Sequence, residues 1–151
     1  MLRQAFTDRL KQAMKARDVR SVSVVRMILA GLKERDVAAR GEANSEGITE
    51  AEIERMLQGM IKQRRESIVL YEQGNRADLA QQERDEIHVI ESFLPQQMTE
   101  DQITAAAQAA IAETGAAGIK EMGKVMSALR QHHAGAMDFS RAGAIVRRLL
   151  G

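Results

Sequence analysis

Apolar residues recur at intervals of three or four along nearly the whole chain, and this spacing constrains the fold more than any other feature of the sequence. It places apolar side chains on one face of a helix, whereas a half-buried strand needs strict alternation of apolar and polar residues. No stretch alternates for long enough to form a strand. The sequence therefore predicts an all-α protein with seven amphipathic helices.

Pro95, the sole proline, divides this helical pattern into two parts. Proline disfavours helical geometry in the residue before it, so the helix that precedes Pro95 should end there. A chain of 151 residues is long enough for one domain or two small ones. We predict a four-helix N-terminal domain over residues 1–95 and a compact three-helix C-terminal domain over residues 96–151.

Capping signals and breaks set the expected helix limits. Thr49 and Glu52 form a capping box, Asp138 caps the last helix, and a left-handed cap is expected at Gly74. Residues 40–48 contain two glycines and no periodicity, which is typical of a mobile loop. The expected helices cover about residues 2–16, 19 or 21 to 39, 50–73, 77–93, 100–114, 119–132 and 139–150.

The periodicity also predicts which side chains are buried. In the N-terminal part these are Leu2, Phe6, Leu10, Ala13, Met14, Val22, Val25, Leu29, Leu32, Ile53, Met56, Leu57, Met60, Ile61, Ile68, Leu70, Leu79, Ile87, Ile90 and Leu94. In the C-terminal part they are Ile103, Ala107, Ala110, Ile111, Met122, Met126, Ile145, Val146, Leu149 and Leu150.

The chain contains no cysteine, which excludes disulfides, thiolate metal sites and thiol nucleophiles. The longest apolar run, residues 22–32, is interrupted by Ser23 and Arg26, and a membrane span needs about 20 apolar residues. The first residues lack the basic-then-apolar plan of a signal peptide. A cytoplasmic protein with no membrane partner is the expectation.

The net charge of +1 hides an uneven distribution of charge. Residues 1–40 hold ten Lys or Arg against four Asp or Glu, whereas residues 41–95 hold six against twelve. Residues 96–151 hold six against five. Such asymmetry either steers a charged partner or reflects neighbouring helices whose charges complement each other.

Searches for catalytic motifs find no glycine-rich phosphate loop and no Gly-x-Ser-x-Gly elbow. His132 and His133 are adjacent, so on a helix they point about 100° apart and do not chelate a metal ion as an i,i+4 pair does. Carboxylate pairs such as Glu83 and Glu86 lie among other charges, on faces that we expect to be solvated rather than buried. We expect no catalytic residue, no metal ion and no cofactor.

Two basic groups are candidates for contact with phosphate. The first, Lys62, Arg64 and Arg65, lies on the predicted third helix, where the alternative is a solvated face with i,i+4 ion pairs. The second lies in the C-terminal part and comprises Lys120, Lys124, Arg130 and Arg141, with Arg147 and Arg148. Gly123 lies between the two lysines, and a helical glycine costs about 1 kcal/mol relative to alanine. That cost indicates close approach either of a neighbouring helix or of a ligand.

Several spaced motifs, taken together, resemble the YqeY family. In the N-terminal part these motifs are Lys62-Gln63-Arg64-Arg65-Glu66-Ser67, Gly74-Asn75-Arg76-Ala77-Asp78-Leu79-Ala80 and Phe93-Leu94-Pro95. Lys120-Glu121-Met122-Gly123-Lys124-Val125-Met126, followed by Gly135 and Asp138, is similar to the tail domain of GatB. GatB is a subunit of the glutamine-dependent tRNA amidotransferase, and the resemblance covers essentially the whole chain.

The resemblance implies a link to tRNA amidotransferases, and in GatB the tail meets the tRNA body. It also implies a carbon–nitrogen ligase activity with glutamine as amide donor, although the parts of such enzymes that carry the chemistry have no counterpart here. Carried over by position, Lys124 is implied to contact phosphate, Gly123 to permit close approach and Asp138 to cap a helix.

Three hypotheses follow. The leading one is a non-catalytic accessory module that binds tRNA through its C-terminal part, with no DNA partner. The second is a module that docks on an amidotransferase or aminoacyl-tRNA synthetase subunit, which suits the acidic residues 41–95. The third, an amidotransferase acting alone, is the weakest because no nucleophile with its base is visible.

Overall fold

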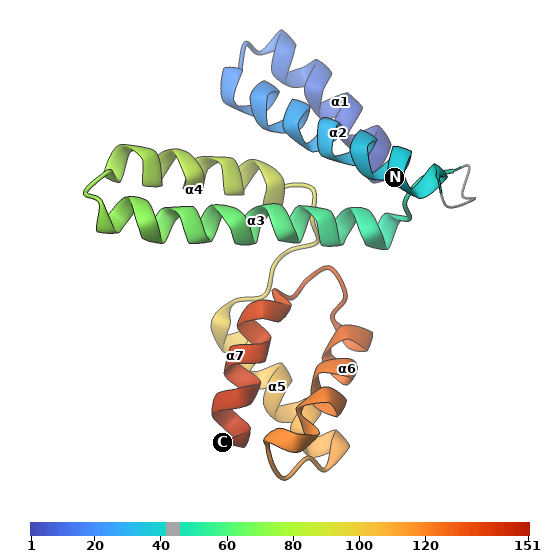
Figure 1. Cartoon of the computed structure of the whole chain (residues 1–151), viewed down its shortest axis with the longest axis vertical. Coiled ribbons are helices and arrows are strands. Elements are labelled where there is room, and N and C mark those ends of the chain that lie inside the picture. The colour runs from blue at the N-terminus through green and yellow to red at the C-terminus, as the bar shows by residue number, and fades with distance from the viewer. Residues whose placement is uncertain (42–45) are drawn as a thin grey trace. The chain divides into compact units, whose positions relative to one another are not determined.

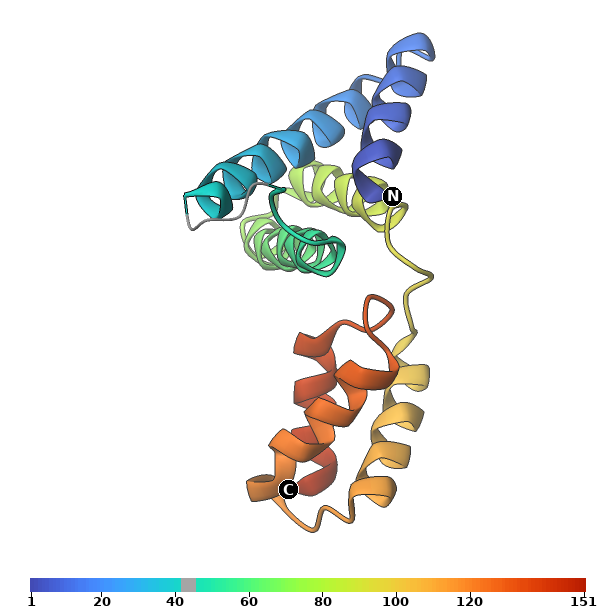
Figure 2. The same cartoon turned by 90° about the vertical axis from the view of Figure 1, so that its right-hand side faces the viewer.

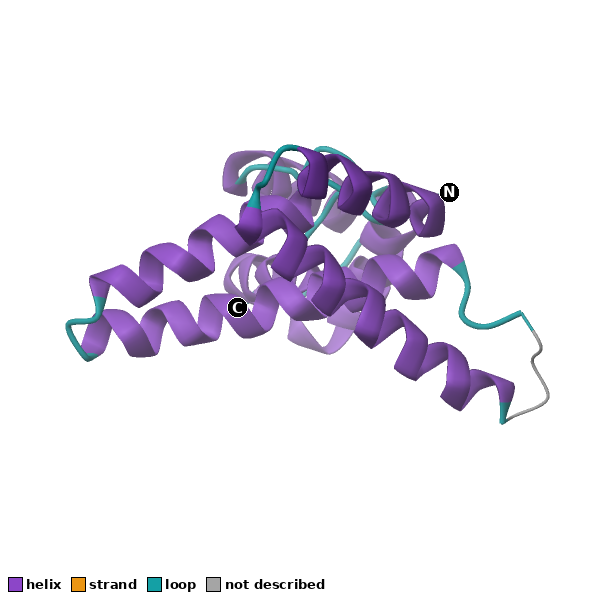
Figure 3. Ribbon diagram, turned by 90° about the horizontal axis from the view of Figure 1, so that it is seen from above, coloured by secondary structure: helices purple, strands orange, loops and turns teal. Residues whose placement is uncertain are grey.

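The computed structural model describes residues 1–41 and 46–151, and the described residues form helices and no strands (Figure 1; Figure 3). The predicted all-α class is therefore confirmed. Residues 42–45, the middle of the expected loop at 40–48, lie outside the described residues. The elements are α1 Leu2–Lys15, α2 Val19–Arg40, α3 Glu50–Gln73, α4 Ala77–Glu91, α5 Glu100–Thr114, the 3-10 helix η1 Ile119–Glu121, α6 Met122–His132 and α7 Phe139–Leu150.

The chain divides into two compact units, which we call the N-terminal unit (Met1–Leu94) and the C-terminal unit (Pro95–Gly151). Helices α1 to α4 belong to the first, and α5, η1, α6 and α7 to the second (Figure 1). Among the described residues, no helix is both long enough and apolar enough to cross a membrane.

In the N-terminal unit, α1 packs on α2, and α3 and α4 form a helical hairpin that α2 also contacts (Figure 1). The rings of Phe6 and Phe93 meet edge to face with their centroids 4.8 Å apart. Thirteen buried residues form the apolar core, namely Phe6, Val24, Val25, Ile28, Leu32, Ile53, Met56, Leu57, Ile61, Ile87, Val89, Ile90 and Leu94.

Most of the predicted core residues of this unit are buried or half-buried, with two clear exceptions. Met14 is 53% exposed and Leu70 is 67% exposed, so both predictions are wrong. Each lies in the last turn of its helix, where little of the chain packs against it. On α2, Val24 and Ile28 are fully buried although only their neighbours were predicted. The reason is that α2 contacts α1, α3 and α4, so it buries more than a single stripe.

Caps define the helix ends much as the sequence predicts. The Thr49 hydroxyl accepts from the Glu52 amide, and the Glu52 carboxylate accepts from the Thr49 amide, so the capping box is present. The left-handed residue after α3, however, is Asn75 (φ 56°), whereas Gly74 has φ −87°. The helix ends at Gln73 as predicted, but the left-handed conformation falls one residue later than predicted, on Asn75, which asparagine tolerates.

A side-chain clasp joins α1, α2 and the segment that leads into α3. Arg3 donates to both carboxylate oxygens of Asp36, at 2.6 and 2.9 Å, and to the carbonyl of Ile48 at 2.9 Å. Asp36 also accepts from the Ile48 amide at 2.9 Å. The polar side chain of Asp36 is 10% exposed, so these bonds satisfy a buried charge. The clasp fixes where α3 begins relative to α2.

The C-terminal unit is a three-helix body around Met137, Val125 and Leu129 (Figure 2). Thr99 and Gln102 form a second capping box at the start of α5, which ends at Gly115 in the left-handed conformation (φ 68°). The Met98 amide donates to the Ala136 carbonyl at 2.9 Å, which ties the entry of the unit to the turn before α7.

Candidate nucleic-acid interface

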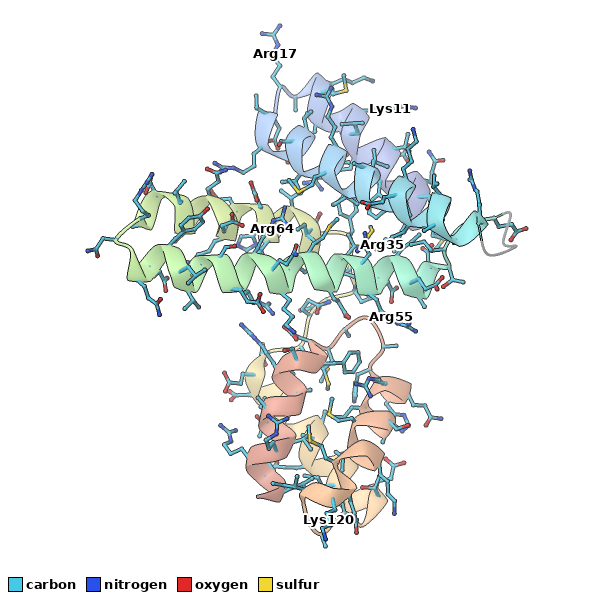
Figure 4. The ribbon with its side chains drawn as sticks, viewed as in Figure 1. Lys11, Arg17, Arg35, Arg55, Arg64 and Lys120 are labelled. Atoms are coloured by element: carbon cyan, nitrogen blue, oxygen red, sulfur yellow. The ribbon has the colours of Figure 1, made fainter. Side chains whose placement is uncertain are left out.

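Three of the candidates from the sequence lie at the start of α6. Lys120 is in η1, and Gly123 and Lys124 are in the first turn of α6, with all three exposed (Figure 4 labels Lys120). A Cβ built on Gly123 would meet no atom within 4 Å. Packing of a neighbouring helix is therefore not the reason for this glycine. Its backbone is open to approach from outside the unit.

Arg130 lies near the other end of α6. Its Cζ is 5.7 Å from the centroid of the Phe139 ring, close enough for a cation–π contact. Ten residues separate Arg130 from Lys120, which corresponds to roughly 15 Å along a helix. Lys120, in η1, and Arg130, in the last turn of α6, therefore lie too far apart to hold the same phosphate group.

Arg141 lines a hollow of about 450 Å³ on α5 and α7 of the C-terminal unit. The other lining residues are Glu100, Ala144, Ile145 and Arg148. Arg148 is separated from Arg141 by seven residues, or two helical turns, and therefore lies on the same face of α7. Arg148 belongs to the basic group predicted from the sequence. The one sequence signal that pairs it with Arg141 is their i,i+7 spacing on α7.

The basic candidates of the C-terminal unit thus belong to three places: the start of α6, the Arg130–Phe139 contact and the hollow. The structure brings Arg141 and Arg148 together in the lining of the hollow. Lys120 and Lys124 lie in two consecutive elements, η1 and α6. Any ligand that touches all of them must be large, which suits a macromolecule better than a small molecule.

Arg64, in the N-terminal unit, is only 8% exposed and lies among helices rather than on a solvated face (Figure 4). Its Nε donates to Glu86 at 3.1 Å, and its two terminal nitrogens donate to the Met60 carbonyl and to the Met27 sulfur. The guanidinium is fully engaged within the fold. Arg64 therefore holds α4 against α3 and does not present its charge to phosphate.

The other two residues of this basic group lie elsewhere. Arg65 is half-buried, with Nη2 3.6 Å from a carboxylate oxygen of Glu91 on α4. Lys62 is exposed on α3. The three cations of the motif therefore do not form one anion-binding surface.

Glu83 and Glu86 are half-buried beside Arg64, so the prediction that this carboxylate pair lies on a solvated face is wrong. Burial raises the pKa of Glu83, and the neighbouring Glu86 adds to the shift, while Arg64 opposes it. Both carboxylates neutralise a buried guanidinium, which is a structural task.

His132 and His133 have ring centroids 6.4 Å apart, and His132 Nε2 lies 3.7 Å from Glu113. Within residues 1–41 and 46–151, no cluster of three or more His, Asp or Glu side chains is arranged to hold a metal ion.

A second hollow, of about 340 Å³, lies in the N-terminal unit and is not predicted by the sequence. It is lined by Arg35, Ile48, Glu52, Arg55 and Met56, and Figure 4 labels its two arginines. Its residues come from α2, α3 and the segment between them, so no local motif marks it.

Comparison with known proteins finds a matching family model and a relative. The model described as "Yqey-like protein" matches residues 3–150. The protein "Altered inheritance of mitochondria protein 41, mitochondrial" of Lachancea thermotolerans is 32% identical over 87 residues. The aligned stretch covers 58% of this chain and 44% of the relative, so the match spans less than half of that protein.

Proposed function

The chain belongs to the YqeY family, and we propose that it is a non-catalytic helical module that binds tRNA through its C-terminal unit. The proposal places the protein in the cytoplasm, beside the enzymes that act on charged tRNA. The carbon–nitrogen ligase activity implied by the resemblance to amidotransferases is not part of it.

One observation carries this proposal: the C-terminal unit exposes cations that have no carboxylate partner. Among the described residues, no carboxylate oxygen lies within 4.0 Å of the charged groups of Lys120, Lys124, Arg130, Arg147 or Arg148. Meanwhile Glu121 accepts from the Ala117 amide and Asp138 caps α7. A phosphate backbone can therefore meet these cations without breaking an ion pair.

The composition of the unit indicates how it would read RNA. Phe139 is the one Phe, Tyr or Trp residue of this unit, and it is half-buried beneath Arg130. Proteins that bind single-stranded bases stack them on exposed aromatic rings. We therefore propose recognition of the shape and phosphate positions of a folded RNA.

The test is electrophoretic mobility shift with bulk tRNA at several salt concentrations. We expect binding at low micromolar protein in low salt, with an affinity that falls as salt rises. No binding under these conditions, or an affinity that does not change with salt concentration, would overturn the proposal.

A matched pair of variants locates the binding unit. Lys120→Ala/Lys124→Ala should reduce the slope of log affinity against log salt by about 1.5, because two phosphate contacts are lost. Lys11→Ala/Lys15→Ala removes two exposed lysines at the same spacing on α1 of the N-terminal unit. That control should leave the slope unchanged.

We also propose that the two compact units are separate domains, with four helices in residues 1–95 and three in residues 96–151. Each unit has its own apolar core, which supports independent folding. Each half expressed alone should show cooperative unfolding by circular dichroism, and residues 96–151 alone should retain tRNA binding. Failure of either half to unfold cooperatively would contradict the division.

A second candidate function, docking on an amidotransferase or synthetase subunit, is favoured by exposed apolar side chains on the N-terminal unit. Val19 is 79% exposed and Leu70 is 67% exposed, and surface apolar groups of this kind suit a protein partner. Capture from a lysate treated with ribonuclease discriminates between the functions. A retained synthetase or amidotransferase subunit favours docking, whereas loss of the partner with the RNA favours tRNA binding.

A further inference from the structure

We infer that the hollow on α5 and α7 receives one ribose-phosphate unit of the RNA, held by Arg141 and Arg148 and checked for its 2′-hydroxyl by Glu100. The inference rests on the proposed function and deepens it, because it assigns the residues that would distinguish RNA from DNA.

The side chains of α7 that line the hollow form a single helical stripe. Arg141, Ala144, Ile145 and Arg148 follow the spacing i, i+3, i+4, i+7, so all four project from one face. The two arginines lie about 10 Å apart along the helix axis, with small or apolar side chains between them. Arginine presents a planar fork of donors that suits phosphate oxygens.

Both arginines are available to a ligand. Arg148 is exposed, with no carboxylate oxygen within 4.0 Å among the described residues. Arg141 is 52% exposed in its side chain, and its Nε reaches Asp138 only at 4.0 Å. The Asp138 carboxylate also accepts from the amides of Ser140 and Arg141, and it thereby caps the N-terminus of α7.

The middle of the stripe is apolar and small. Ala144 has a single methyl group, and Ile145 is 6% exposed, so it forms part of the unit's core. Such a surface can pack against the carbon atoms of a sugar ring without offering a competing polar group. A volume of about 450 Å³ falls within the range of sites for small ligand groups.

Glu100 is the feature that selects among anionic ligands. Its carboxylate is acceptor-only when ionised, so it repels a bare phosphate and favours a ligand that also offers a donor. Ribose offers its 2′-hydroxyl beside the phosphodiester, and deoxyribose does not. Asp101, the next residue, is also an acid in the first turn of α5 but does not line the hollow. Both acids complement the dipole of α5, so it is the position of Glu100 in the hollow that distinguishes it from Asp101.

The experiment uses the full chain with an RNA hairpin and a DNA hairpin of the same sequence. The variants form two matched pairs, Arg148→Ala against Arg147→Ala and Glu100→Ala against Asp101→Ala. Within each pair the two variants change the net charge equally, on the same helix, and only one member lines the hollow.

We expect Arg148→Ala to weaken RNA binding about tenfold and to reduce the salt slope by about 1, while Arg147→Ala has a smaller effect. Glu100→Ala should lower the ratio of RNA to DNA affinity at least fivefold, mainly by strengthening DNA binding, while Asp101→Ala leaves the ratio near that of the wild type. Circular dichroism verifies that each variant is folded, and Arg148→Gln replaces Arg148→Ala if the latter is not.

The outcomes separate this inference from the proposed function. If the wild-type protein binds neither bulk tRNA nor the RNA hairpin, the proposed function fails. If it binds RNA with normal salt dependence but the two members of each pair behave alike, the hollow is not the contact and the inference is overturned.

Discussion

Gly47 lies so close to Asp36 that a Cβ on Gly47 would be 2.3 Å from the Asp36 Oδ1 atom. Gly47 also has φ +88°, which side chains of L-residues rarely adopt. Both facts require glycine at this position in the clasp. Gly47→Ala should therefore lower the free energy of unfolding by about 2 kcal/mol or more, measured by urea denaturation.

Gly118→Ala is the matched control for this prediction. Gly118 has an extended backbone (φ −167°), and a Cβ there would meet no atom within 4 Å. Its substitution should change the free energy of unfolding by only a few tenths of a kcal/mol. Equal effects at the two glycines would show that the clasp does not require residue 47 to be glycine.

The clasp should also make stability depend on pH. Hydrogen bonds from Arg3 and from the Ile48 amide lower the pKa of Asp36 to about 2, although burial alone would raise it. In the unfolded chain the pKa of an aspartate is about 3.9. The stabilisation is therefore complete above about pH 4 and is lost as the pH falls towards about 2. Asp36→Asn should destabilise the protein at neutral pH, by an amount that shrinks to near zero in this acid range.

Unfolding by urea at a series of pH values measures that difference. Glu34→Gln, an exposed position on the same helix, should follow the wild-type curve. A gap between Asp36→Asn and the wild type that stayed constant between neutral pH and about pH 2 would exclude a role for the Asp36 carboxylate in this pH dependence.

Arg64→Ala should destabilise the N-terminal unit by about 3 kcal/mol, because Glu83 and Glu86 would then share a half-buried site without their counter-ion. The pKa of Glu83, already raised by burial, should rise further when Arg64 is removed. Thermal unfolding measures the first effect and NMR titration of the glutamates measures the second. At a temperature where the variant is folded, its affinity for tRNA should match that of the wild type.

Gly123→Ala should separate stability from binding. The Cβ would enter open space on a helix, so unfolding should become harder by up to about 1 kcal/mol. If RNA approaches the backbone there, the same methyl group should weaken tRNA binding. Gly59→Ala, in an equally open position on α3, should add similar stability with no effect on binding. Unchanged affinity in Gly123→Ala would remove this glycine from the interface.

Local signals in the sequence predict the elements of this fold well. The Thr49 and Asp138 caps and the end of α5 at Gly115 depend on residues a few positions apart, and the structure confirms all three. The register of α2 was only partly predicted, because its burial depends on three other helices. Periodicity predicts that a helix has an apolar face, but it does not show how many other helices pack against that helix.

The candidate site shows the same limit more sharply. Arg64 looks like a solvated cation in the sequence because its neighbours on α3 are polar, and its partner Glu86 lies 22 residues away. The hollow beside Arg148 likewise depends on Glu100, which comes from a different helix. Residue types and spacing identify cations, but only tertiary contacts decide which of them remain accessible to a ligand.

The clasp gives the Ile48 amide an unusual position, because this residue lies outside the helices yet donates to the buried Asp36 carboxylate. Loop amides ordinarily exchange their hydrogen with solvent quickly, through openings that cost little free energy. Here exchange requires the Arg3 and Asp36 pair to open as well. Hydrogen–deuterium exchange should therefore find at Ile48 an isolated slow amide, whose rate reports the opening of the first helix from the rest of its unit.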